Sequence, residues 1–147
     1  GACTKRWQKL AQRLGIDERC RWRGWLSRDE ALSIIHKAHV FVITSLKDLT
    51  SSVLLESLSQ GVPVICPDYC GFHDVVTERC GIKVPVETPL QIMADIASAI
   101  GYLAEKENER RLLAKGALDR IQDFLWDKKA GGVDLIYKKK LQKMHYD

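Results

Sequence analysis

Residues 45–71 read SLKDLTSSVLLESLSQGVPVICPDYCG, and this stretch decides the fold that the sequence predicts. It contains a loop from Ser45 to Thr50, a helix from about Ser51 to Gln60 that ends at a glycine, and a strand from Pro63 to Cys66. Glycine just past the last apolar position is a common helix end. The β-branched segment His39 to Thr44 comes before the loop and predicts another strand. Strand, helix and strand in this order are the repeating unit of a parallel sheet.

The same alternation continues on both sides of this stretch. The other strands that we predict are Arg19–Arg23 and the segment GIKVPV at 81–86. The other helices are Thr4–Leu14, one after the capping box Ser27-Arg28-Asp29-Glu30, Phe72–Glu78, one from Thr88-Pro89, Glu107–Ile121 and Asp127–Met144. We therefore expect an α/β fold, a Rossmann-like parallel sheet with helices on both faces. The chain opens with a helix, which indicates either an unusual start or a first strand missing from the N-terminus.

Length and composition favour one globular domain over residues 1–147. Apolar residues make up 46% of the chain and charged residues 29%, which are ordinary values for a folded protein. No apolar run approaches the roughly 18 residues of a membrane span, and the N-terminus lacks the apolar core of a signal peptide. We therefore expect a cytoplasmic protein. The five cysteines are an odd number, which argues against a disulfide framework and favours buried thiols.

The net charge of +4 is weak evidence for any polyanion, and we expect no nucleic-acid partner. The basic residues gather in residues 1–28 and in the tail, at Lys138–Lys140 and Lys143. Solvated helix faces explain such runs, and two alternatives stay open: an anionic membrane surface at the inner face, or a phosphate-rich ligand. The pairs His36–His39 and Cys66–Cys70 have no further ligands at metal-site spacing, so we expect no metal.

Residues 48–56 have the chemistry of an anion and hydroxyl site. The N-terminus of a helix attracts anions such as phosphate, and Thr50, Ser51 and Ser52 can cap it and add hydroxyl donors. Glu56 lies about 7.5 Å along the helix from Ser51, at about 1.5 Å per residue, where its carboxylate can accept from a ribose diol. Asp48, on the loop, can accept from sugar hydroxyls. Alternatively, Glu56 belongs to a polar helix face and Asp48 is an ordinary loop acid.

The run from 41 to 76, FVITSLKDLTSSVLLESLSQGVPVICPDYCGFHDVV, resembles the donor-site signature of the family 4 (group 1) retaining glycosyltransferases, which have the two-domain GT-B fold. In that family a Glu-x7-Glu pair brackets a Gly-Phe-Gly loop. Asp48 stands at the first Glu and Glu56 matches the second. The further matches are Ser45, Gly61, Pro63, Val64, Ile65, Asp68, Gly71 and Asp74, then Gly24 upstream and Phe124, Trp126, Leu135, Ile136 and Tyr137 downstream.

The resemblance implies the C-terminal, donor-binding domain of a larger two-domain enzyme. It implies that Asp48 and Glu56 are the catalytic pair, with Glu56 on the ribose and Asp48 on the sugar. It also implies that Thr50, Ser51, Ser52 and Val53 bind the diphosphate of a UDP- or GDP-sugar, and that Gly24, Trp25 and Leu26 lie near the base. The resemblance further implies that no cofactor or metal is required, that transfer retains configuration, and that the partner is a missing N-terminal acceptor-binding domain.

Three departures from the family pattern keep alternatives open. Asp48 is shorter than Glu, Leu49-Thr50-Ser51 replaces Gly-Phe-Gly, and Cys70 stands at the expected second glycine of the Asp68 motif. The first function that we predict is glycosyl transfer, with this polypeptide inactive alone. The alternatives are a non-catalytic module that binds a nucleotide or nucleotide sugar, and a flavodoxin-like regulatory domain.

Overall fold

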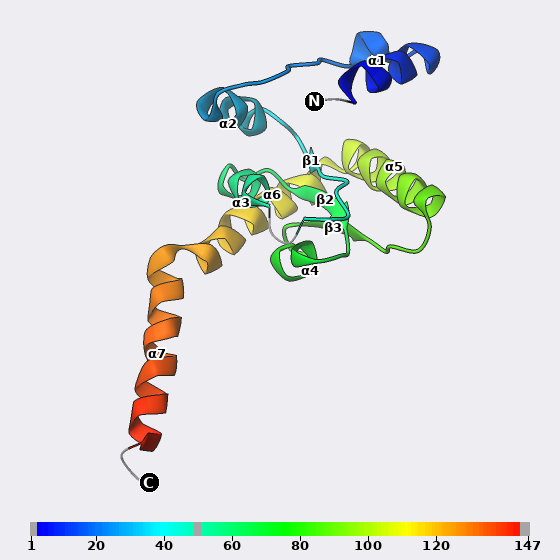
Figure 1. Cartoon of the computed structure of the whole chain (residues 1–147). Helices are drawn as coiled ribbons and strands as arrows, with labels where there is room; N and C mark the ends of the chain where they lie inside the picture. Colours follow the sequence, from blue (N-terminus) through cyan, green and yellow to red (C-terminus); the bar gives the residue numbers. More distant parts are fainter. Residues whose placement is uncertain (1–2, 49–50, 145–147) are drawn as a thin grey trace. The chain divides into compact units, whose positions relative to one another are not determined.

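The computed structural model describes residues 3–48 and 51–144, and the chain forms two compact units, residues 1–31 and 32–147 (Figure 1). The first unit holds α1 (Thr4–Arg13) and the 3-10 turn η1 (Asp17–Arg19). Helix α1 confirms its prediction, and Gly15, just past its end, has φ +65°. This left-handed conformation is one that glycine adopts without strain.

The strand predicted at Arg19–Arg23 is wrong. Asp17–Arg19 forms a short 3-10 turn, and residues 20–23 carry no strand or bridge assignment. A strand exists only through hydrogen bonds to a neighbouring strand, and the described residues provide none for this segment. The alternation of Cys20 and Trp22 with basic residues is therefore not enough to form a strand.

Helix α2 (Arg28–His36) starts with the predicted capping box. The backbone N–H and the hydroxyl of Ser27 donate to the Glu30 carboxylate at 2.8 and 2.7 Å, and the Glu30 N–H donates back to Ser27 Oγ at 3.4 Å. These hydrogen bonds from Ser27 lower the pKa of Glu30. Reciprocal bonds of this kind satisfy N–H groups that the first helical turn leaves without partners.

The second unit is built on a parallel sheet in the order β1-β2-β3, formed by Phe41–Val42, Val64–Pro67 and Gly81–Val84. Strand β2 lies between the other two and is buried along its whole length. The predictions for β2 and β3 are confirmed, whereas β1 is shorter than the predicted His39–Thr44. Among the described residues β1 pairs only with β2. The Phe41 N–H donates to the Pro63 carbonyl at 2.9 Å, and the Ile43 N–H donates to the Ile65 carbonyl at 3.0 Å.

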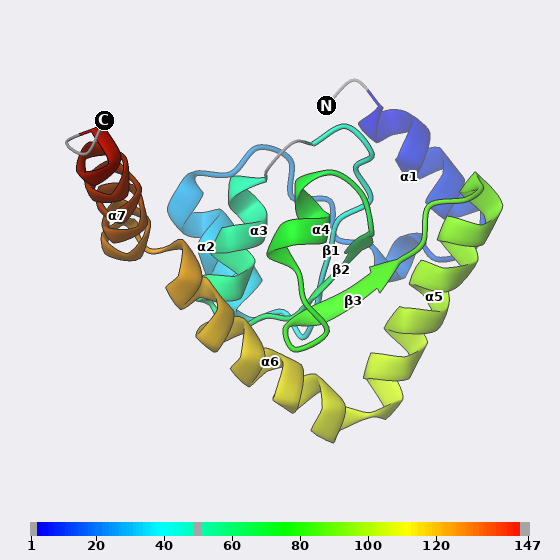
Figure 2. The same ribbon diagram turned by 90° about the horizontal axis from the view of Figure 1, so that it is seen from below.

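Helices cover both faces of this sheet, which confirms the predicted fold class (Figure 2). On one face lie α3 (Ser52–Ser59), α4 (Gly71–Val75) and α6 (Glu107–Ile121), whose buried residues pack on Val64 and Cys66. On the other face α5 (Pro89–Glu105) packs Ile92, Ile96 and Leu103 on Ile65. Successive residues of β2 thus point to opposite faces, as in a doubly covered parallel sheet.

The helix ends follow the predicted signals. Helix α3 stops at Gly61, which has φ +68°; the Gly61 N–H donates to Leu58 O at 3.0 Å and the Val62 N–H to Ser57 O at 3.1 Å. This is the Schellman arrangement that commonly closes a helix. At α5 the Thr88 hydroxyl accepts from the Gln91 N–H at 3.2 Å, with Pro89 at the first helical position.

The chain continues through the 3-10 turn η2 (Gln122–Phe124) into α7 (Trp126–Met144). The side chains of α7 are exposed from residue 126 to residue 142. Among the helices that the structure describes, none combines the length and the apolar character that crossing a membrane requires.

Candidate functional site

The three parallel strands end at the same edge of the sheet. The loop after β1, which carries Asp48 and leads into the helix of Glu56, starts at this edge. Asp48 lies in the loop after β1 and is half-buried. Glu56 lies in the second turn of α3, also half-buried, on the helix that this loop enters. The fold therefore brings both acids to the loop and helix that follow β1. Their assignment to sugar and ribose stays a prediction.

The start of α3 differs in one detail from the expected cap. Ser51 is the N-cap residue with extended backbone, but its hydroxyl makes no capping hydrogen bond. Ser52 is exposed and Val53 half-buried in the first turn. The first-turn N–H groups are thus not capped by Ser51 itself, and such groups can bind an anion. Thr50, the other predicted hydroxyl, lies outside the described residues.

The base-binding residues expected from the resemblance belong to the first unit. Gly24 has φ +67°, a conformation that favours glycine. Trp25 is 96% exposed and Leu26 is half-buried. Asp48 and Glu56 belong to the second unit, so the role of Gly24, Trp25 and Leu26 stays a prediction.

A second polar cluster lies at the carboxyl edge, on the loop that leaves β2. Asp68 directly follows this strand, and its Oδ1 lies 2.7 Å from His73 Nδ1 and 3.2 Å from Lys83 Nζ. Lys83 also donates to the His73 carbonyl at 3.1 Å. The hydrogen bond from His73, and then that from Lys83, lowers the pKa of Asp68. Sequence analysis matched Asp68 to a family motif but missed Lys83, because the pairing of β2 and β3 brings this lysine to the loop.

The backbone between Asp68 and His73 is strained. Cys70 has φ +50° and ψ −143°, and it is the one non-glycine residue with positive φ in the described part of the chain. This is the position where the family pattern has glycine. Such a conformation costs on the order of 1–3 kcal/mol and persists only where the surroundings hold it.

Arg120 of α6 holds the other end of the α4 segment. Its guanidinium donates to the carbonyls of Val75 at 3.0 Å and Asp74 at 2.6 Å, and to the Asp123 carboxylate at 2.8 Å. The same guanidinium lies 4.9 Å from the centre of the Phe124 ring. Contacts from Asp68 and Lys83 at one end and from Arg120 at the other fix the short helix α4.

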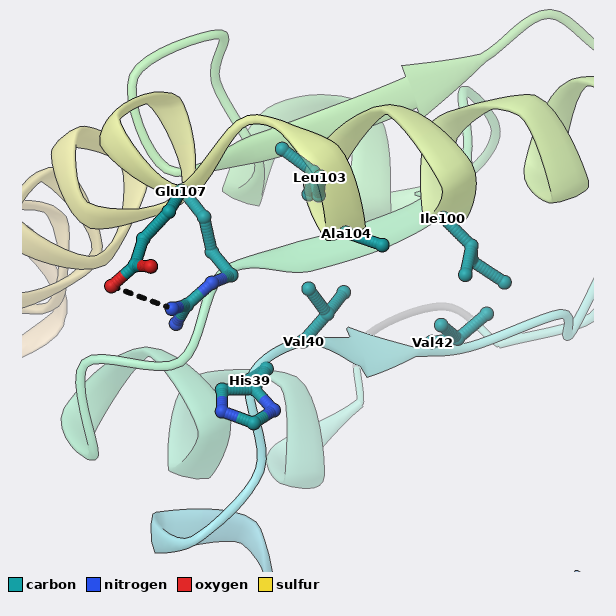
Figure 3. Close-up of a pocket in the computed structure, with 8 residues that line it drawn as sticks. His39, Val40, Val42, Ile100, Leu103, Ala104 and Glu107 are labelled. Atoms are coloured by element: carbon teal, nitrogen blue, oxygen red, sulfur yellow. Dashed lines mark ion pairs between the residues drawn. The ribbon is translucent and has the colours of Figure 1, made fainter. Parts of the chain in front are cut away.

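A hollow of about 500 Å³ lies elsewhere, beside β1 (Figure 3). In the close-up, Val40 and Val42 point toward Ile100, Leu103 and Ala104 of α5. At one end lie His39 and the ion pair Glu107–Arg110, with 3.7 Å between oxygen and nitrogen. His39 and Val40 come before β1, so this end of the hollow is at the amino end of the strand. Parallel sheets bind ligands at the opposite edge, so the hollow is not the predicted donor site.

The five cysteines differ in burial, and Cys20 is half-buried. Cys66 and Cys80 are buried as expected, and burial raises the pKa of the Cys66 thiol to about 12. Cys3 and Cys70 are exposed, contrary to the expectation of buried thiols, because they lie outside the sheet core, before α1 and α4. Within residues 3–48 and 51–144 no cluster of three or more histidine, cysteine or acidic residues has metal-site geometry.

A parallel sheet covered on both faces, with polar loops at the carboxyl ends of its strands, defines an α/β ligand-binding domain of the Rossmann-like class. The sequence model of the family described as "Glycosyl transferases group 1" matches residues 1–120. This chain therefore belongs to the group 1 glycosyl transferases.

Individual relatives agree with the family. A D-inositol 3-phosphate glycosyltransferase of Streptomyces bingchenggensis (strain BCW-1) is 31% identical over 137 residues, which cover 92% of this chain and 29% of the relative. The sucrose-phosphate synthase of Thermosynechococcus elongatus has a similar structure, with a TM-score of 0.75 and 25% identity over 97% of this chain and 35% of the synthase. A chain of a GtfA/B complex shares the fold, with a TM-score of 0.74 and 16% identity over 100% of this chain and 29% of its own length.

These matches confirm the expected family and its GT-B architecture. The chain spans about a third or less of each of these three proteins.

Proposed function

We propose that this chain is the donor-binding part of a retaining glycosyltransferase and binds a nucleotide-diphosphate sugar at the carboxyl edge of its sheet. Family membership carries the proposal, and the position of Asp48 and Glu56 on the loop and helix after β1 supports it. A ligand in this place meets a helix N-terminus, hydroxyls and two carboxylates. These groups complement a diphosphate flanked by two sugars.

In this proposal each predicted residue has a separate task. The N–H groups and hydroxyls at Thr50, Ser51, Ser52 and Val53 bind the diphosphate. Glu56 accepts from the ribose hydroxyls, and Asp48 accepts from hydroxyls of the transferred sugar. The segment Gly24 to Leu26 lies near the base. The leaving diphosphate is stabilised by positioned donors and positive charge, without a required metal.

The acceptor side of the reaction belongs to a further domain in this proposal. The curated relative and the synthase are about three times as long as the matching part. The complete enzyme acts in the cytoplasm, and basic residues such as Lys138–Lys140 are available for contact with an anionic membrane surface. The alternative is a binding module without catalysis, which uses the same carboxyl edge for the same ligand.

The test is the affinity of the 147-residue chain for UDP and GDP, measured by calorimetry for the wild type and for Glu56→Gln. For whichever of UDP and GDP binds better, we expect a dissociation constant of about 1 mM. Glu56→Gln keeps the shape of the side chain but removes its charge. It should weaken binding by about 1–3 kcal/mol, the range for a hydrogen bond to a charged group.

A matched control is Glu105→Gln, at the end of α5, where the glutamate is exposed. This change removes the same charge from the chain and should leave the affinity unaltered. Equal weakening in both variants would indicate general charge effects and contradict the ribose role of Glu56. If the wild type binds neither UDP nor GDP, the proposed function is refuted.

A further inference from the structure

His73, in the short helix α4 that follows β2, has one ring nitrogen engaged and most of its side chain open to solvent. His73 Nδ1 lies 2.7 Å from Asp68 Oδ1, while 63% of the His73 side chain is exposed. A carboxylate partner is an acceptor, so Nδ1 carries the hydrogen of this bond. In the neutral ring the other nitrogen, Nε2, then has a free lone pair and is a hydrogen-bond acceptor.

Lys83 fixes this arrangement from the neighbouring strand. Its Nζ lies 3.2 Å from Asp68 Oδ1 and donates to the backbone carbonyl of His73 at 3.1 Å. Only 20% of the Lys83 side chain is exposed, so it is largely withdrawn from solvent. The lysine therefore ties both the carboxylate and the backbone of the histidine to β3, and the ring is held in one orientation.

The backbone of the loop between Asp68 and His73 is strained. Cys70, between Asp68 and His73, has φ +50° without being a glycine. Arg120 holds the far end of α4 by bonds to the carbonyls of Asp74 and Val75. A strained backbone held from both sides is typical of ligand-binding loops, because there the geometry must be fixed before the ligand arrives.

The place of the cluster in the fold is the same sheet edge that carries the two acids. Asp68 follows the last residue of β2, and Lys83 is next to the last residue of β3. Phe72 and Val75 of α4 belong to the same hydrophobic core as Leu54 and Leu58 of α3, and β1 and β2, which lead into these helices, are adjacent in the sheet. The loops after β1 and β2 are therefore neighbours, and a ligand at the N-terminus of α3 has the β2 loop next to it.

We propose that His73 is a specificity residue, and that its Nε2 accepts a hydrogen bond from a hydroxyl of the transferred sugar. Asp68 and Lys83 are positioning residues that hold its ring. The inference rests on the proposed function and deepens it, because it assigns the sugar a contact beyond Asp48. A hydroxyl suits this nitrogen, since it can donate to a neutral imidazole, whereas a fully ionised phosphate cannot.

The test compares free nucleotides with nucleotide sugars on the 147-residue chain: UDP with UDP-glucose, and GDP with GDP-mannose. His73→Ala should weaken binding of the sugar-bearing ligand about fivefold, the effect of one neutral hydrogen bond, and leave the free diphosphate unaltered. His73→Gln, whose amide oxygen still accepts, should restore part of the loss. The matched control is His36→Ala, an exposed histidine at the end of α2 that should change neither affinity.

Asp68→Ala separates a positioning role from a structural one. Nitrogen NMR of the His73 ring should report the Nδ1–H tautomer in the wild type and a mixture in Asp68→Ala, with the loss of affinity again confined to the sugar-bearing ligand. Amide spectra of the variants check that the fold is kept.

The outcomes are distinct. A loss that is equal for nucleotide and nucleotide sugar, or no loss at all, overturns the role of His73 while the proposed function stands. If the wild type binds none of the four ligands, the proposed function fails, and this inference fails with it.

Discussion

Asp68 shows how one residue links the fold to the candidate site. Its carboxylate is the common acceptor for His73 of α4 and Lys83 of β3, and it directly follows the central strand. The hydrogen bond from His73 and the charge of Lys83 lower its pKa, so the folded chain favours the ionised form. The same residue that holds the His73 ring by a hydrogen bond therefore makes stability depend on pH.

The sign of this dependence follows from linkage. A carboxyl group with a depressed pKa in the folded state stabilises the fold above its ordinary pKa of 3.8. The contribution is lost as pH falls from that value through the depressed one. We expect Asp68→Asn to lower the free energy of unfolding at pH 6. The difference in free energy of unfolding between this variant and the wild type should become smaller as the pH falls toward 3. Urea unfolding at a series of pH values checks this, and a gap independent of pH would contradict it.

The sequence predicts some site residues but not their partners. Asp48 and Glu56 could be placed on their elements because a loop and a helix that ends at Gly61 follow the β1 segment directly, so local signals suffice. Lys83 could not be predicted as a partner of Asp68. Its place depends on the register Cys66↔Lys83 between two strands, which short strands without alternating polarity do not specify.

At the scale of elements, helices with clear end signals were predicted well. Helix α6 has the predicted bounds. Helix α3 begins after Ser51 and ends before Gly61, and α5 begins after Thr88, as predicted. Caps are local chemistry and can be recognised in one sequence. The predicted strand Arg19–Arg23 was wrong, and the strand predicted at His39–Thr44 was longer than the observed β1. Both errors arise because a strand depends on a partner elsewhere in the chain.

The packing of α6 gives a test at this scale. Gly116 lies so close to the loop before β3 that an added Cβ would be 1.8 Å from the Arg79 carbonyl oxygen. Gly116→Ala must therefore push α6 away from the backbone at Arg79, and we expect the free energy of unfolding to fall by about 1–3 kcal/mol. The matched control is Gly101→Ala in α5, where no atom lies within 4 Å.

Gly101→Ala should raise stability by about 0.5–1 kcal/mol, because alanine loses less backbone entropy in a helix. Thermal or urea unfolding of the two variants gives both values. A Gly116→Ala variant as stable as the wild type would contradict the close contact between α6 and Arg79.

At the scale of the whole molecule, the family match covers residues 1–120, which include all of the first compact unit and most of the second. This match favours a glycosyltransferase over the flavodoxin-like alternative, which shares only the general α/β pattern. A catalytic enzyme and a binding module without catalysis differ in the groups around the leaving diphosphate, and the carboxyl edge of the sheet fits both alternatives.

We expect the 147-residue chain alone to transfer no sugar. In the proposed function the acceptor site belongs to another domain and the cations that neutralise the leaving diphosphate lie upstream of these 147 residues, and transition-state stabilisation needs those charges in place. The assay is release of UDP or GDP from nucleotide sugars in the presence of sugar and inositol phosphate acceptors. Efficient, acceptor-dependent release by the purified chain would show that this division of labour is wrong.

The central claim is that the ligand binds at the loop–helix junction after β1, and amide shift mapping tests it most directly. The chain, labelled with ¹⁵N, is titrated with UDP and with GDP. We expect the largest shifts at residues 50–56, with a second group at 24–26. Shifts confined to the basic tail, residues 138–143, would show nonspecific attraction of the anion and would contradict the account.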